Sequence, residues 1–323
     1  MRRILCPKNA LLISSACLVL AACGGATDSE TTSSSTTGRS DADVAERTIA
    51  PRVDCRAVAR SADDAKSEGA AYDIRGLKPG LSYDDAFAAV SCAEGIARVE
   101  DGGAFFRMNT HGFPTRQKLI ASNGVACTSD DAVRGRYGQP DYEKGGCDNR
   151  LRGFSQYFKN VDDVMMLAFT GVEGEETLRG VWRARYFDAG SRPSYDAMRA
   201  SLVEKYGEPH FTTHTDAWLS WVFDARGRPM SQSDPNFITC ANGSPMLDGA
   251  IGWNAACGVT LAAYLHRSRS DPALIEKLDM GLIDQAGLYE GAEAMQAALD
   301  AMHAERQAAE ASEASKSLSA DDL

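Results

Sequence analysis

The sequence predicts a mixed α+β fold made of tandem modules, each starting with a helix and continuing into an antiparallel sheet. Three stretches lead to this prediction. Residues 193–223 have the pattern of a helix, a sharp stop and an aromatic strand, residues 130–140 repeat it more weakly, and residues 153–187 are rich in β-forming residues. With 323 residues, 44% of them hydrophobic, the chain is long enough to bury a substantial core.

The stretch 193–223 carries the clearest pattern. A helix is expected after Pro193 because apolar residues recur at helical spacing, and Gly207 followed by Pro209 ends it. Residues 218–223 then predict a strand, since β-branched and aromatic side chains favour extended backbone. The earlier stretch ends its expected helix in a similar way, because Tyr-Gly-Gln-Pro at 137–140 matches Tyr-Gly-Glu-Pro at 206–209.

Four other segments have recognisable patterns. Ser82 is expected to cap a helix, and residues 104–108 and 116–121 are expected to form a hairpin. Residues 259–265 form an apolar run that fits a strand or a helix. Asp271 followed by Pro272 is typical of a helix start, which predicts a C-terminal helix that docks on the body.

The N-terminus has the features of a secretory signal. Residues 1–22 combine a basic start with an apolar run that is too short to span a bilayer. The sequence Leu-Ala-Ala-Cys-Gly that ends this segment resembles the bacterial lipobox, which implies cleavage before Cys23 and acylation of that cysteine, including palmitate. Gly24 after it, rather than Asp, implies sorting to the outer membrane, facing the periplasm. The alternative is an ordinary secretory signal with a coincidental cysteine.

Composition and pattern divide the chain into six parts. They are a lipoprotein signal peptide (1–22), a flexible tether rich in Ser and Thr (23–52), a first α+β module (53–150), a second α+β module (151–268), a C-terminal helical segment (269–310) and a disordered tail (311–323).

The charge balance limits the kinds of partner. The formal net charge is −11, and much of the acidity lies after residue 270. Non-specific nucleic-acid binding needs a basic surface that neutralises phosphates, so no nucleic-acid partner is expected. The partners expected are the membrane, through the Cys23 anchor, and an envelope protein.

Six cysteines remain after those of the signal and the lipid anchor are set aside. An even number in an oxidising compartment predicts disulfides, and six cysteines allow 15 connectivities. Local pairing needs the least rearrangement, and no C-x-x-C spacing supports a zinc site. The expected pairs are Cys55–Cys92, Cys127–Cys147 and Cys240–Cys257.

Catalytic and cofactor motifs are missing from the sequence. It contains no G-x-S-x-G elbow, S-x-x-K pair, P-loop or H-E-x-x-H motif. His210 and His214 with Asp216 are the one group to weigh as metal ligands, and solvated surface histidines explain them better. We therefore expect no catalytic residue, metal or cofactor.

Residues 178–187 carry a candidate binding face. Strict alternation along a strand would place Leu178 and Trp182 on the core face and Arg179, Arg183 and Arg185 together on the other. Solvation, or pairing with carboxylates of a neighbouring strand, explains such a row. The sharper hypothesis is that these arginines receive an acidic partner or an anionic envelope component.

The helix-then-sheet pattern also resembles known envelope modules. The segment 76–86, with its Pro-Gly turn before Ser82, and the Tyr-Gly-x-Pro stops are similar to the small outer-membrane lipoproteins of the β-barrel assembly machine and to the β-lactamase-inhibitor-like fold. The resemblance covers about residues 72–224 and implies function through protein binding, without a cofactor. The expected function is a lipid-anchored binding or envelope-structural protein, and the alternative is an envelope hydrolase whose site is assembled from distant residues.

Overall fold

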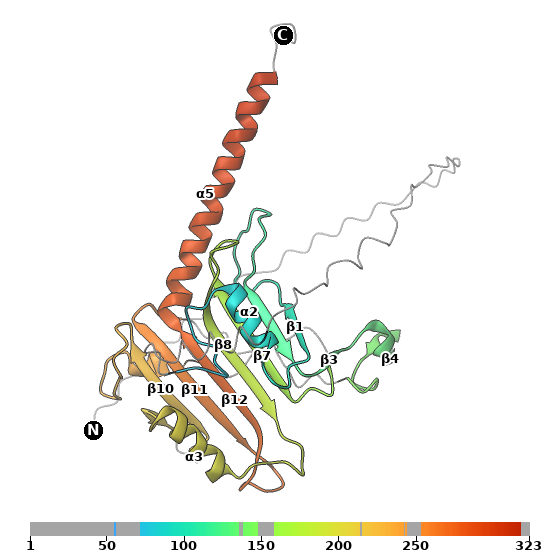
Figure 1. The fold of residues 1–323 in the computed structure, drawn as a ribbon, viewed down its shortest axis with the longest axis vertical. Coiled ribbons are helices and arrows are strands. Elements are labelled where there is room, and N and C mark those ends of the chain that lie inside the picture. Colours follow the sequence, from blue (N-terminus) through green and yellow to red (C-terminus); the bar gives the residue numbers. More distant parts are fainter. Residues whose placement is uncertain are drawn as a thin grey trace, which may run out of the picture. The chain divides into compact units, whose positions relative to one another are not determined.

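The described part of the chain is built on one antiparallel sheet of eight strands (Figure 1). The computed structural model describes residue 55 and residues 72–135, 138–147, 158–213, 215–241, 243 and 253–317. In spatial order the strands are β1 (Arg98–Asp101), β2 (Lys118–Ser122), β7 (Asp163–Thr170), β8 (Thr177–Tyr186), β12 (Ile275–Asp284), β11 (Cys257–Arg267), β10 (Trp218–Asp224) and β9 (Phe211–Thr212). A mixed α+β fold with a large antiparallel sheet is thereby confirmed.

Helices and small ribbons complete the fold. The helices are α2 (Tyr83–Ser91), α3 (Tyr195–Tyr206), α4 (Phe237–Ala241) and α5 (Gln285–Ser317), with a 3-10 turn at Ser129–Asp131. Between β2 and β7 lie two short ribbons, β3 (Val125–Ala126) paired with β6 (Phe158–Lys159), and β4 (Val133–Arg134) paired with β5 (Pro140–Asp141).

The eight strands fall into two runs with the same order of elements. Helix α2 is followed by β1, β2, β7 and β8, and helix α3 is followed by β9, β10, β11 and β12. The last strands of the two runs, β8 and β12, pair with each other in the centre of the sheet.

Both runs begin with the same local structure. The sequence Ser-Tyr-Asp starts α2 at Ser82 and α3 at Ser194, and each serine hydroxyl accepts a hydrogen bond from the backbone N–H three residues on. Each serine also forms an isolated antiparallel bridge, to Thr177 and to Leu274, at the start of the last strand of its run. The cap therefore ties each helix to the central pair of strands.

The sheet is covered on both faces. Buried side chains of α2 and α3, such as Val90 and Leu202, pack with Leu167 and Val181 in one cluster on what we call the α2/α3 face. Trp182, together with Val164, packs against Leu288 of α5 on the opposite face, the α5 face. Strand β7 alternates between the two clusters, which explains its continuous apolar sequence.

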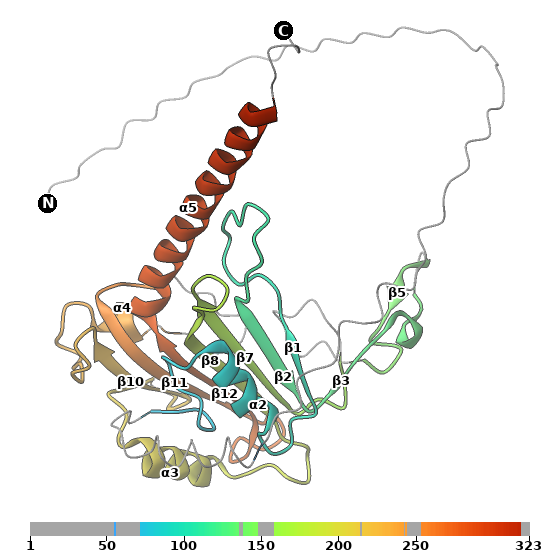
Figure 2. The same cartoon turned by 45° about the horizontal axis from the view of Figure 1, so that its top comes forward.

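Helix α5 starts on the sheet and continues well beyond it (Figure 2). Its residues Met295 and Leu299 are buried, but the side chains from Ala304 to Lys316 are exposed. None of the helices described here, α5 included, combines the length and apolar character needed to cross a bilayer.

The loop between β1 and β2 packs along α5. His111 Nε2 lies 2.7 Å from Asp300 Oδ1, and Arg306 donates a hydrogen bond to the His111 carbonyl. The middle of the long helix is therefore held by a loop from the first run of strands.

Three expected elements differ in the structure, and one ambiguous run is resolved. The helix expected at 130–136 is a 3-10 turn followed by β4. The helix of the first run that corresponds to α3 is α2. The helix expected from Asp271 starts only at Gln285, because residues 275–284 form the buried strand β12, and it runs past residue 310 to Ser317. The strand expected at 104–108 lies earlier, at β1, and the ambiguous run 259–265 is part of strand β11.

The three expected disulfides are confirmed. The structure joins Cys55 to Cys92, Cys127 to Cys147 and Cys240 to Cys257, each pair within 37 residues in sequence. Cys240 of α4 and Cys257 at the start of β11 are completely buried.

Candidate functional site

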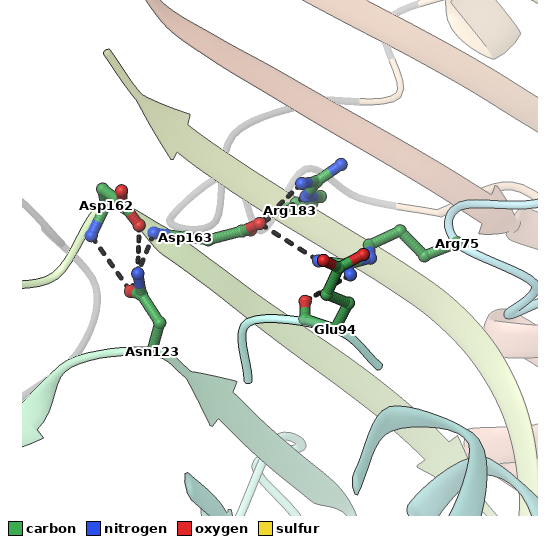
Figure 3. A network of polar contacts seen from close by, with 6 residues as sticks. All are labelled: Arg75, Glu94, Asn123, Asp162, Asp163 and Arg183. Atoms are coloured by element: carbon green, nitrogen blue, oxygen red, sulfur yellow. Dashed lines mark hydrogen bonds and ion pairs between the residues drawn. The ribbon is translucent and has the colours of Figure 1, made fainter. Parts of the chain in front are cut away.

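Four charged side chains gather on the α2/α3 face where β7 begins and β8 ends, three of which are drawn in Figure 3. Arg183 donates to both carboxylate oxygens of Asp163, with Nε at 2.8 Å and Nη2 at 2.5 Å. Arg75 Nη1 donates to the same carboxylate at 3.2 Å. Arg185 faces Asp163 directly across the β7–β8 ladder. We call Arg75, Asp163, Arg183 and Arg185 the arginine cluster.

A tight turn positions Arg75. Ile74 and Leu77 exchange two backbone hydrogen bonds, and both side chains are buried, so the two residues between them form the tip. Arg75 has φ +56° and Gly76 has φ +80°. The left-handed region is uncommon for an arginine, and it costs free energy unless the surroundings impose it. Here the buried flanks and the bonds to Asp163 and to the Glu94 carbonyl hold it.

Asp163 is held from the backbone as well as from its side chain. Asn123 Oδ1 accepts hydrogen bonds from the N–H groups of Asp162 and Asp163, which pins the start of β7 beside the end of β2. The Asp163 side chain is only 11% exposed, and that of Arg183 is 14% exposed. The fork between them is therefore largely shielded from water, where a charge-assisted bidentate contact is strong.

Positive charge exceeds negative charge in this cluster. The cluster has three guanidinium groups and one carboxylate: Arg75 and Arg183 bind Asp163, and among the described residues Arg185 forms no ion pair with a carboxylate. Arg185 is exposed and lies over the Phe187 ring, with its guanidinium carbon 5.3 Å from the ring centroid. Arg116 shows the usual arrangement for comparison, because it contacts both Glu176 and Asp84.

Arg179 does not belong to this cluster. The pairing of β7 with β8 shifts where Ala168 faces Gly180 and Phe169 faces Leu178, so Arg179 is an extra residue in a β-bulge. Its side chain lies on the α5 face, where Nη1 donates to Asp284 at 3.0 Å. The bulge also moves Leu178 to the α2/α3 face. The prediction that all three arginines share a face with strict alternation is therefore wrong.

Tyr206 and the ion pair between Lys205 and Asp73 border the cluster on the side of α3. The Tyr206 hydroxyl donates to the Asp73 carbonyl at 2.8 Å, and Lys205 pairs with the Asp73 carboxylate. Burial raises the pKa of the Tyr206 hydroxyl, so it remains a neutral donor at physiological pH. These contacts link α3 to the segment that carries Arg75.

The other candidate residues from the sequence have different outcomes. Cys23 lies outside the described residues. So does His214, while the Nδ1 atom of His210 accepts a hydrogen bond from the Val222 N–H at 2.9 Å. Among the described residues, no group of three or more His, Cys, Asp or Glu side chains could hold a metal ion.

Sequence reasoning missed Arg75 and Asp163. The pair Arg75-Gly76 between two apolar residues is a signal for a tight turn, but nothing in the sequence points its side chain at β7. Asp163 stands at the start of an apolar run and has no local partner.

Comparison with protein-family models, curated proteins and solved structures finds no match to this chain. The site therefore has to be interpreted from its own geometry.

Proposed function

We propose that this chain is a lipid-anchored protein of the bacterial envelope that binds an acidic partner through the arginine cluster. The observation that carries this proposal is the excess of guanidinium groups over carboxylates in one place on a chain of net charge −11. A planar guanidinium group binds carboxylates in a bidentate way, and an uncompensated cluster steers acidic surfaces toward it.

The remaining parts of the proposal rest on sequence features. Residues 1–22 would be the cleaved signal, Cys23 the acylated residue and residues 23–52 the tether, with the folded part facing the periplasm from the outer membrane. The two runs of one helix and four strands support a tandem-module origin, similar to the envelope modules named above. In such a protein the partner is expected to be another envelope protein.

Arg185 provides the direct test of the binding face. Arg185→Ser removes an exposed charge that has no ion-pair partner in the described structure, so stability should change little. Association with the partner should slow by roughly threefold to tenfold at low salt, and the difference should shrink as salt rises. The measurement is quantitative crosslinking in intact cells, followed by binding kinetics with the captured partner.

Arg179→Ser is the matched control in the same strand. It removes an arginine from the opposite face, where Arg179 is paired with Asp284, and should leave capture unchanged. Equal capture of the partner by the Arg185→Ser and Arg179→Ser variants would contradict the proposal that the partner binds the arginine cluster. Arg183→Ser is less informative because it also breaks the shielded fork with Asp163.

The lipid anchor has an independent test. Cys23→Ala should give an unacylated and uncleaved precursor, because the modified cysteine is the residue at the cleavage site. Metabolic labelling with a palmitate analogue and the mass of the mature chain measure this. A labelled mature protein from the variant would exclude the anchor at Cys23.

A further inference from the structure

A band of half-buried side chains crosses four strands on the α5 face. Trp218 of β10 faces Tyr264 of β11 across the ladder. Two residues further along β11, His266 faces Lys277 of β12, which in turn faces Tyr186 of β8. We call these five residues the aromatic band. It lies on the opposite face of the sheet from the arginine cluster.

One buried carboxylate holds the polar members of the band in place. Asp279 is fully buried, and its Oδ2 atom lies 2.6 Å from His266 Nε2 and 2.9 Å from Lys277 Nζ. Its Oδ1 atom is also buried and has no hydrogen-bond partner in the described structure. Moving either side chain away would leave a buried charge without one of its partners, which costs free energy. These contacts therefore hold His266 and Lys277 in position.

The rings of the band flank these two polar groups. Tyr264 lies edge to face with His266 at 4.3 Å between centroids, and Trp218 lies edge to face with Tyr264 at 6.0 Å. Lys277 Nζ is 5.2 Å from the Tyr186 centroid. The side chains of Lys277 and His266 are 21% and 27% exposed, so both remain accessible.

This arrangement sets the hydrogen-bonding character of the surface. In the neutral tautomer that donates its Nε2 proton to Asp279, His266 keeps Nδ1 as an acceptor. The Lys277 ammonium group has three donors, of which Asp279 uses one. The band thus presents a fixed donor and a fixed acceptor beside aromatic rings, while Lys277 and Asp279 cancel in charge.

We propose that the aromatic band is a binding site for a neutral saccharide. Adjacent hydroxyl groups of a pyranose both donate and accept hydrogen bonds, which matches Lys277 and His266, and the apolar face of the sugar ring can pack on Tyr264 or Trp218. A cationic ligand is disfavoured because the Lys277 ammonium group already occupies the position where a cation would contact the Tyr186 ring and the Asp279 carboxylate. An anionic ligand gains little from a pair whose charges cancel.

The test uses the full chain in a zwitterionic detergent without a sugar headgroup. Saturation-transfer NMR with chitotetraose and with maltotetraose should detect binding of at least one of them at millimolar concentration. Tyr264→Ala should weaken that binding by about tenfold, the loss expected for one stacked ring. Tyr264→Phe keeps the aromatic ring and should therefore retain oligosaccharide binding.

Two further variants keep the test independent of folding. Trp218→Ala should also weaken binding, and Tyr289→Ala, which removes an exposed ring of α5, should not. Absence of saturation transfer from both oligosaccharides, or undiminished binding by the alanine variants at Tyr264 and Trp218, would overturn the proposal. Capture of a protein by the band without saccharide binding would overturn it too. Because the band and the arginine cluster lie on opposite faces, either proposal can fail alone.

Discussion

Replacing Trp221 by alanine is expected to lower the free energy of unfolding by about 3–5 kcal/mol. Trp221 is fully buried in the cluster of the α2/α3 face, where its ring centroid is 5.6 Å from that of Tyr206. Its Nε1 atom donates to the Gly207 carbonyl at 2.9 Å, at the point where α3 ends. The substitution would leave a large cavity and an unpaired carbonyl group, and would loosen α3 from the sheet.

Chemical denaturation followed by circular dichroism measures this change. Trp218→Ala is the matched control, because Trp218 stands in the same strand but is only half buried on the other face. Its loss should cost roughly 1–2 kcal/mol. Similar losses for the two variants would show that Trp221 does not anchor α3 in the way the structure indicates.

Removing the Cys240–Cys257 disulfide is expected to have the second largest effect. The double variant Cys240→Ala, Cys257→Ala frees a segment of 17 residues, for which chain entropy predicts a loss of about 3 kcal/mol. The bridge joins α4 to the start of β11 within a small cluster that includes the fully buried Phe237. Without it, α4 should exchange its amide hydrogens faster than the central strands.

Hydrogen exchange and denaturant unfolding of the double variant check this prediction. Mild reduction of the native protein is the companion experiment, because Cys55 is exposed whereas Cys240 and Cys257 are fully buried. The Cys55–Cys92 bridge should be reduced first. Reduction of the buried bridge first, or unchanged exchange in α4 of the double variant, would contradict the predicted role.

Local signals in the sequence were reliable where neighbours in the chain decide the structure. Ser194 caps α3, and Gly207 follows its last residue with φ +79°. The β-forming residues of 153–187 correctly indicated strands, which are β7 and β8. Disulfide pairing was predictable because all three bridges are local.

Distant contacts decided the elements that were predicted wrongly. Asp271 followed by Pro272 has the local chemistry of a helix start, but residues 275–284 are held as a strand between β8 and β11. Helix α5 begins only where Asp284 can accept from the Gly287 N–H, after the strand is complete. Local propensity was overridden there by pairing on both sides of β12.

The sequence by itself determined the α+β class, the Ser82 cap of α2, the start and stop of α3 and the local disulfides, because these follow from residues close together in the chain. Only the tertiary structure decided which charges meet. A single extra residue in a β-bulge sends Arg179 to Asp284 on one face and leaves Arg183 with Asp163 on the other. Strand register and the turn that carries Arg75 are set by distant contacts, such as that between Arg75 and Asp163 across 88 residues, and alternation within one strand cannot reveal them.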